Sequence, residues 1–204
     1  MKTLDRTKFL LNAAMILVLA SYASDSCYGD GDSVPAADRE KRRQAMAASD
    51  HLIVPGERIG PIRLGMGMDQ VLETLGRPDS TQTTRDSYHW HYSDLNMQID
   101  FDLGAAPSVR QVATSAYTDK PFDTNTTSWS DLKPLTTVFH TDNGIQLGAS
   151  SFDVKRAFSS YSYTDPGGVV MNYEHIGIRF GVTSDFRVWA ISVGYPTRLF
   201  DGQH

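Results

Sequence analysis

The sequence contains one cysteine, Cys27, among its 204 residues. A single cysteine cannot form an internal disulfide, so the fold must be stabilised by its hydrophobic core. Basic residues are also outnumbered: 19 lysines and arginines stand against 24 aspartates and glutamates, for a net charge of −5. A nucleic-acid-binding surface would be basic, so the composition excludes nucleic acid as the partner.

The chain has one long apolar run, at residues 9–20. Lys2, Arg6 and Lys8 precede it, and small residues at positions 21 and 23 follow it. A basic start, an apolar run of about a dozen residues and a small-x-small site are typical of a secretory signal peptide. The run is shorter than the roughly 20 residues of a membrane-spanning helix. We therefore expect export, with no integral membrane span once the leader is removed.

Cys27 lies four residues beyond the end of this leader. It is either a lipid anchor or an unpaired cysteine, and the triplet Ser-Asp-Ser before it fits a lipoprotein signal poorly.

Two stretches of the chain share one pattern of apolar residues and glycine. The first comprises Ile62, Leu64, Gly65, Val71, Leu75, Ile99, Phe101, Val109 and Val112, and the second Ile145, Leu147, Gly148, Val154, Phe158, Ile178, Phe180, Val188 and Ile191. Corresponding residues keep one constant spacing up to Leu75 and a slightly shorter one from Ile99 onward, which indicates a short deletion in the second copy. A repeat of this length indicates two copies of one supersecondary unit.

Each copy is expected to contain a short helix and antiparallel strands. Apolar residues at i, i+3, i+4 and i+7 predict helices at 68–75 and 152–159. Alternating patterns predict strands at 87–93, 95–101 and 109–115, and again at 170–173, 176–182 and 187–193. The sequence thus predicts an α+β fold of two tandem repeats, each a short helix packed on an antiparallel sheet of three to four strands. Val71 and Val154 should be buried at equivalent positions.

These patterns divide the chain into six segments. They are the signal peptide 1–23, a flexible tether 24–57, repeat 1 at 58–117, a linker 118–143, repeat 2 at 144–196 and a tail 197–204. Residues 24–50 lack a hydrophobic period and carry charges of both signs, which favours a tether or a frayed helix.

His89 and His91 form the sharpest local motif. Two residues at i and i+2 on a strand point to the same side, so this pair could offer two imidazoles to zinc, with Asp100 or Asp102 as a third ligand. The alternative is that both are ordinary polar residues on an open sheet face, opposite Trp90. No metal or other cofactor is assigned.

Motifs for nucleophilic catalysis are lacking. Cys27 lies just after the leader, and the serines at 150 and 151 fit helix caps because no Gly-x-Ser-x-Gly elbow surrounds them. The glycines at 60–67 lack the Gly-Lys-Ser/Thr ending of a phosphate loop. The sequence therefore predicts a non-enzymatic protein.

The pattern Ile-x-Leu-Gly-Met at 62–66, Leu-Gly-x-Pro at 75–78 and Tyr-His-Trp-His-Tyr at 88–92 resembles an exported superfamily. It is that of the small outer-membrane lipoprotein of the bacterial barrel-assembly machinery, and the tandem arrangement is similar to that of the β-lactamase inhibitory proteins. The resemblance covers most of residues 58–196. It implies a non-catalytic module that binds a protein partner of the cell envelope, in the periplasm or at the outer membrane.

Three functions follow as hypotheses. The first is a binding or assembly module of the cell envelope that recognises a protein partner through open sheet faces or the groove between the repeats. The second is a secreted enzyme inhibitor of the β-lactamase-inhibitory type, and the third is a metal-dependent hydrolase. The residues expected to bind are His89, His91, Gln98, Asp100, Arg110 and Arg179.

Overall fold

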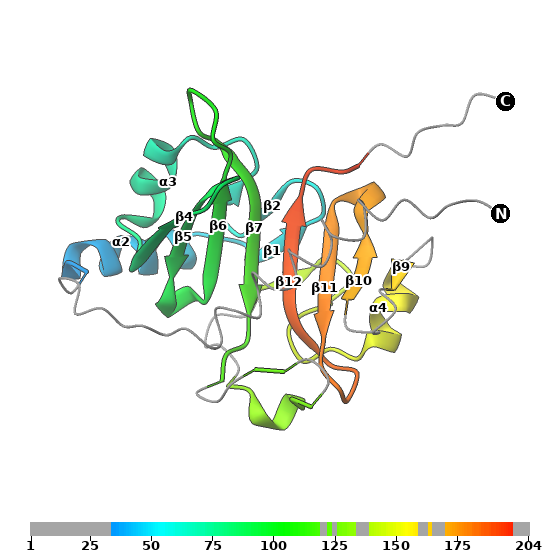
Figure 1. Ribbon diagram of the computed structural model, residues 1–204. Coiled ribbons are helices and arrows are strands. Elements are labelled where there is room, and N and C mark those ends of the chain that lie inside the picture. Colours follow the sequence, from blue (N-terminus) through cyan, green and yellow to red (C-terminus); the bar gives the residue numbers. More distant parts are fainter. Residues whose placement is uncertain are drawn as a thin grey trace, which may run out of the picture.

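The structure is a computed structural model (Figure 1), and it describes residues 34–118, 122–123, 126–133, 139–158, 163–164 and 170–197. The signal peptide 1–23, Cys27 and the tail beyond residue 197 lie outside these residues. Within the described part, no helix is both long enough and apolar enough to cross a bilayer.

A single eight-stranded sheet runs across the molecule in the order β4-β5-β6-β7-β12-β11-β10-β9. Its strands are β4 Ser80–Thr83, β5 Tyr88–Tyr92, β6 Met97–Phe101, β7 Val109–Ser115, β9 Tyr163–Thr164, β10 Val170–Tyr173, β11 Ile178–Val182 and β12 Val188–Gly194. All neighbouring strands in it are antiparallel, and β7 pairs with β12 to join the two halves. The six strands expected from the sequence are all present.

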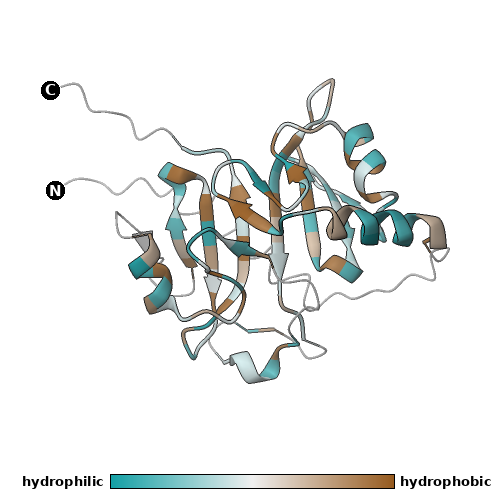
Figure 2. Cartoon of the chain, turned by 180° about the vertical axis from the view of Figure 1, so that it is seen from behind, coloured by the Kyte–Doolittle hydropathy of each residue, from teal (hydrophilic) through white to brown (hydrophobic). Residues whose placement is uncertain are grey.

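A second layer covers one face of this sheet, as Figure 2 shows from behind. It contains the helices α2 Ala36–Ala47, α3 Met68–Leu75 and α4 Ser151–Ala157. Between them lies a small sheet of order β3-β2-β1-β8, made of β1 Leu52–Val54, β2 Arg58–Ile59, β3 Ile62–Arg63 and β8 His140–Thr141. Three single 3₁₀ turns complete the elements: η1 Ser93–Leu95, η2 Trp129–Asp131 and η3 Glu174–Ile176. The α+β class is therefore confirmed.

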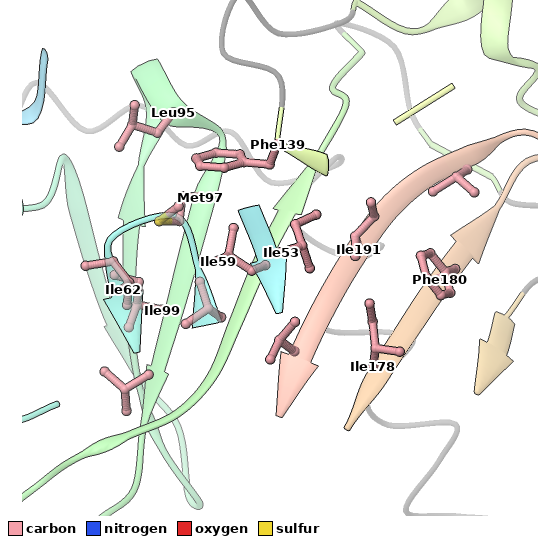
Figure 3. Packing of buried hydrophobic residues seen from close by; sticks show 14 of the residues in the cluster. Ile53, Ile59, Ile62, Leu95, Met97, Ile99, Phe139, Ile178, Phe180 and Ile191 are labelled. Carbon is pink, nitrogen blue, oxygen red and sulfur yellow. The ribbon is translucent and has the colours of Figure 1, made fainter. Parts of the chain in front are cut away.

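The core lies between the two layers. In Figure 3, Ile53, Ile59 and Ile62 of the small sheet lie over the apolar side chains of both halves of the large sheet. Val71 on α3 and Val154 on α4 are both fully buried, as their helical periodicity predicts. One continuous apolar cluster therefore connects the small sheet, the helices and the large sheet.

The expected flexible tether is wrong for residues 36–54. This segment forms α2 and β1, and Arg42, Met46 and Ile53 are buried. The linker also contributes structure, because β8 pairs in parallel with β1. The pattern was missed because α2 is hydrophilic along most of its length, as its colours in Figure 2 indicate, and one of its two buried residues is charged.

Arg42 fixes α2 to the first half of the molecule. Its Nη1 lies 3.0 Å from a carboxylate oxygen of Asp79 and 2.8 Å from one of Asp94. Its Nε donates to the Leu75 carbonyl at 3.1 Å, and Nη2 donates to the carbonyl of Arg77. Its guanidinium carbon also lies 4.7 Å from the centre of the Tyr92 ring. A buried arginine is tolerated here because its donors are satisfied and its charge is paired.

We predict that Arg42→Ala lowers the free energy of unfolding by about 2–4 kcal/mol, since it removes a buried side chain and leaves the carbonyls of Leu75 and Arg77 and the partly exposed Asp79 without their donor. Urea unfolding followed by circular dichroism measures the loss. The matched control is Arg43→Ala, which removes an exposed arginine paired only with Glu40 one turn earlier. That change should cost less than about 0.5 kcal/mol; equal losses for both variants would contradict the anchoring role of Arg42.

Candidate functional site

The candidate residues gather on the face of the large sheet that carries no helix, the side turned to the viewer in Figure 1. Strand register puts His91, Gln98, Ala113, Ser192 and Arg179 in one row across the sheet. A neighbouring row contains His89, Asp100, Gln111 and Gly194. On the opposite face, Trp90 packs against the apolar core, with its ring centroid 4.7 Å from that of Phe101. Strand alternation therefore predicted the sides of the strands correctly.

The expectation that this whole face is open is wrong. His89, Gln98 and Asp100 are only 5%, 8% and 5% exposed, and His91 is half-buried. Their burial has a physical reason: the side chains bond to one another and to the turn that connects β4 with β5, which closes over them.

His89 is at the centre of this buried network. Its Nδ1 lies 2.6 Å from Asp100 Oδ1, and its Nε2 lies 2.8 Å from the Ser87 hydroxyl oxygen. Gln98 donates to the same Asp100 oxygen at 2.7 Å. With a proton on Nδ1, His89 donates to the carboxylate and accepts from the hydroxyl, which satisfies both ring nitrogens.

A serine bonded to a histidine that is bonded to an aspartate is also the arrangement of a hydrolase triad. The sequence patterns did not identify Ser87 as a candidate. A nucleophile must reach its substrate, however, and Ser87 is only 2% exposed. The zinc interpretation of His89 meets a different obstacle, because both of its ring nitrogens are already engaged. The described residues also contain no cluster of three or more His, Cys, Asp or Glu side chains arranged to bind a metal. The network is best explained as a satisfied polar core.

A pocket of about 290 Å³ opens beside this network, at the end of β7 and β12. It is lined by Arg110, Gln111, Glu174, Gly177, Ile178, Arg179, Ser192, Gly194, Tyr195 and Thr197. Gln111 and Ser192 are more than nine-tenths buried, whereas Tyr195 is 57% exposed. The pocket thus brings together Arg110 and Arg179, two of the six expected binding residues.

Arg110 reaches this pocket because of a β-bulge. The register between β6 and β7 shifts at Asp100 and Phe101, so that Phe101 faces Val109 while Asp100 faces Gln111. The extra residue is Arg110, and a bulge turns such a side chain away from strict alternation. Arg110 is exposed and donates to the backbone carbonyl of Asp86 at 3.3 Å.

Arg179 lies on the other side of the pocket. Its Nη2 is 3.1 Å from Glu174 Oε1, and about a third of each side chain is exposed. Gly177 lies nearby with φ of 73°, and a Cβ there would collide with the Gly194 carbonyl oxygen. Only glycine permits this close approach of β12. The pocket is therefore lined by two arginines, one glutamate and the buried polar residues Gln111 and Ser192.

The opposite end of the same face is covered. There Ala116, Leu132, Trp189 and Ala190 form a second apolar cluster, with Phe122 and Trp129 packed against it. Described residues between 116 and 133 therefore cover one end of the face, and the other end remains as the pocket.

No family model and no curated protein matches the chain. Among solved structures, an extracellular protein containing an SCP domain from Bacillus anthracis matches with a TM-score of 0.38 and 10% identity, over 65% of this chain and 44% of that one. A cysteine-rich secretory protein from Staphylococcus aureus matches with a TM-score of 0.35 and 13% identity, over 69% and 48%. The chain thus spans about half the length of these proteins, and scores this low establish neither a shared fold nor a function.

These comparisons correct the resemblance drawn from the sequence. The matching structures are SCP-type secretory proteins, not barrel-assembly lipoproteins or β-lactamase inhibitory proteins. The motifs on which that resemblance rested, such as those at 62–66 and 75–78, consist mostly of glycine, proline and apolar residues. Many folds that pack a helix on a sheet need such residues in their turns and cores.

We predict that His89→Phe alone costs about 3–5 kcal/mol, because it leaves the Asp100 carboxylate buried without its partner. The double variant His89→Phe/Asp100→Leu should cost less than that single change, since no charged carboxylate then remains buried without its histidine. Chemical denaturation of the single variants and the double variant measures the coupling. Additive losses would mean that the pair does not act as a unit.

We also predict that His91 makes stability depend on pH. Burial lowers the pKa of His91 below its ordinary value of 6.5, with a smaller contribution in the same direction from Arg42, against the opposing effects of Asp79 and Asp94. The unfolded chain therefore takes up the His91 proton at a higher pH than the folded chain does. As pH falls below about 6.5, the folded state loses stability, by at most about 1.4 kcal/mol per pH unit for this one group.

Thermal melts between pH 8 and pH 5 check this prediction. His91→Gln should lose less stability than the wild type over the acid part of the range, and the two proteins should show parallel behaviour above pH 7.5. Identical pH profiles throughout would contradict the assignment.

Proposed function

We propose that the chain is an exported, non-enzymatic binding module of the bacterial cell envelope, which holds an acidic group of a protein partner in the pocket between Arg110 and Arg179. The observation that carries the proposal is the pocket itself, with two arginines among the residues that line it. Export rests on the signal peptide pattern at residues 1–23.

The chemistry of the pocket favours an anion. Guanidinium groups bind carboxylates through paired, charge-assisted hydrogen bonds, and Arg110 donates one long hydrogen bond to the backbone carbonyl of Asp86. Glu174 already pairs with Arg179, so it fixes the direction of that side chain. Gln111 and Ser192 supply further polar groups at the floor.

The size of the pocket favours a side chain or chain end over a large ligand. At about 290 Å³ it lies at the lower limit of pockets that enclose drug-sized molecules. A glutamate, an aspartate or a C-terminal carboxylate fits such a space. We therefore infer a protein partner, which would cover the exposed Tyr195 at the rim.

We also infer that the two halves are copies of one unit. Gly65 donates to the Val109 carbonyl at 2.8 Å, and Gly148 makes the same bond to Val188 at 2.8 Å. Both glycines have a left-handed backbone, with φ of 83° and 86°. The β7–β12 pairing supports this inference, because Ala113 faces Ser192, its counterpart in the repeat: each directly follows the matched pair Val112 and Ile191. A two-fold axis through that pair would relate the halves.

The repeat alignment needs one adjustment in β6 and β11. The bulge between Asp100 and Phe101 corresponds to the bulge between Gly181 and Val182, whereas the apolar pattern matches Phe101 with Phe180. A shift of two residues keeps each side chain on the same face of its strand, so the apolar pattern alone could not detect it.

The two other functions are less well supported. The inhibitor hypothesis depended on the resemblance that the comparisons overturn. The hydrolase hypothesis needs His89 as a metal ligand, and that side chain bonds Asp100 and Ser87 instead.

A photo-crosslinking amino acid at Tyr195, expressed in cells that export the protein, tests the proposed binding. We expect a crosslink to a discrete protein, and its loss on Arg110→Glu or Arg179→Glu because charge reversal repels an acidic group. Leu103 provides the control site: it is 44% exposed, close to Tyr195 in accessibility, and does not line the pocket.

Two results would count against the proposal. One is an equal set of crosslinked products from Tyr195 and Leu103. The other is a crosslink at Tyr195 that survives both charge reversals in variants whose melting temperatures match the wild type.

A further inference from the structure

The most exposed large apolar side chains of the described residues lie in one corner, away from the pocket in the fold. Phe152 is 66% exposed and Phe186 is 60% exposed. The Phe186 carbonyl accepts from Ser151 N at 2.9 Å, which brings the tip of the β11–β12 hairpin against the start of α4. Figure 1 shows this tip and α4 on the same side of the molecule. We call Phe152, Lys155, Phe186 and Arg187 the aromatic corner.

Phe186 occupies a backbone position that suits glycine. Its φ is 62°, and it closes the turn in which its N–H donates to the Thr183 carbonyl at 3.0 Å. Left-handed φ is strained for a bulky residue, and hairpins usually place glycine at this position. Burial of the Phe186 ring does not offset this strain, because most of the ring is exposed. Backbone strain that no stabilising contact offsets suggests that the residue has a function.

Phe152 also exposes a large apolar side chain to solvent, which is unfavourable. Its backbone N–H is used by the helix cap, donating to Ser150 Oγ at 3.2 Å, while its ring faces solvent. Lys155 Nζ lies 6.0 Å from the centre of that ring. Two largely exposed aromatic side chains thus come from backbone segments that a hydrogen bond joins, which is more than the single scattered apolar residues of an ordinary surface.

The charges around the rings are mixed, with three basic side chains, Lys155, Arg156 and Arg187, against two carboxylates, Asp153 and Asp185. Asp153 pairs with Arg156 at 3.6 Å, and Asp185 accepts from the Thr183 hydroxyl at 2.6 Å and from Trp129 N at 3.0 Å. Lys155 forms no salt bridge with a carboxylate among the residues that the structure describes. Arg187 donates to the Gly148 carbonyl at 3.2 Å and lies near enough to Asp185 to favour the charged form of that carboxylate. This corner therefore offers cations next to exposed rings on a chain that is acidic overall.

We propose that the aromatic corner is a membrane-contact surface, which inserts Phe152 and Phe186 into the interface of an anionic bilayer while Lys155 and Arg187 contact lipid phosphates. In Figure 1 the tip of the β11–β12 hairpin projects beyond the sheet, so it could enter a soft interface. Aromatic rings and basic side chains are the groups that hold a protein at such an interface.

Vesicle flotation tests this proposal, using the protein as exported and purified from cells. We expect flotation with vesicles of phosphatidylethanolamine and phosphatidylglycerol, and much less with neutral phosphatidylcholine vesicles or at high salt. Phe152→Ser/Phe186→Ser should weaken binding at least about tenfold, since each ring gives up its apolar burial in the lipid. Lys155→Glu/Arg187→Glu should have a similar effect on anionic vesicles alone.

Two further variants separate binding from folding. Phe186→Gly removes the ring at a position that glycine adopts without strain, so its melting temperature should equal or exceed that of the wild type while vesicle binding falls. Leu103→Ser removes an exposed apolar side chain elsewhere and should leave binding unchanged.

The proposal is overturned if the wild type fails to float at lipid excess, if it binds neutral and anionic vesicles equally, or if the phenylalanine variants float like the wild type. Sedimentation velocity, which measures the oligomeric state, tests whether a second copy of the chain covers the aromatic corner instead. A dimer that the phenylalanine variants dissociate, in a protein that ignores vesicles, would assign the corner to a second copy of the chain and would also overturn it.

Discussion

The antiparallel pairing of β7 with β12 is the constraint on which the rest of the molecule depends. Five residue pairs join the halves there, from Gln111–Gly194 to Ser115–Ala190. Because of this pairing, eight strands form one sheet, and the small sheet can pack its isoleucines across both halves at once (Figure 3). Each half alone would expose strand edges and part of this shared core, so we expect neither half to be stable by itself.

The same pairing creates the pocket, because Gln111 and Gly194 lie side by side at its floor and rim. The first half contributes Arg110 and the second contributes Arg179 and Glu174. Binding at this place is therefore coupled to the association of the halves, since a ligand that bridges the two arginines stabilises the joined sheet and gains nothing from a separated one.

Sequence patterns predicted the strands and the helices α3 and α4, because their apolar periodicity is set by burial on one side. They missed α2, because its buried residue Arg42 is held by ion pairs. A hydrophobic pattern does not count a charged residue as buried. Alternation gave the side on which His89 and Asp100 lie, but it could not give their burial, which depends on Ser87 and the turn around it. The pocket could not be predicted because Arg110, one of its lining residues, lies at a bulge that the alternating pattern does not reveal.

The pocket and the second apolar cluster carry a consequence for the history of the molecule. Under the proposed duplication, Arg110 and Trp189 are counterparts, since each directly follows one of the matched valines Val109 and Val188. An ancestral pair of identical subunits would have carried the same residue twice and offered two equal cavities. In the proposed duplication, fusion into one chain would remove that symmetry requirement. One end of the sheet could then be covered by Trp189 and residues of the connecting segment. The other end, with Arg110, could remain open as the pocket. A symmetric dimer cannot specialise its two ends in this way, whereas a fused chain can.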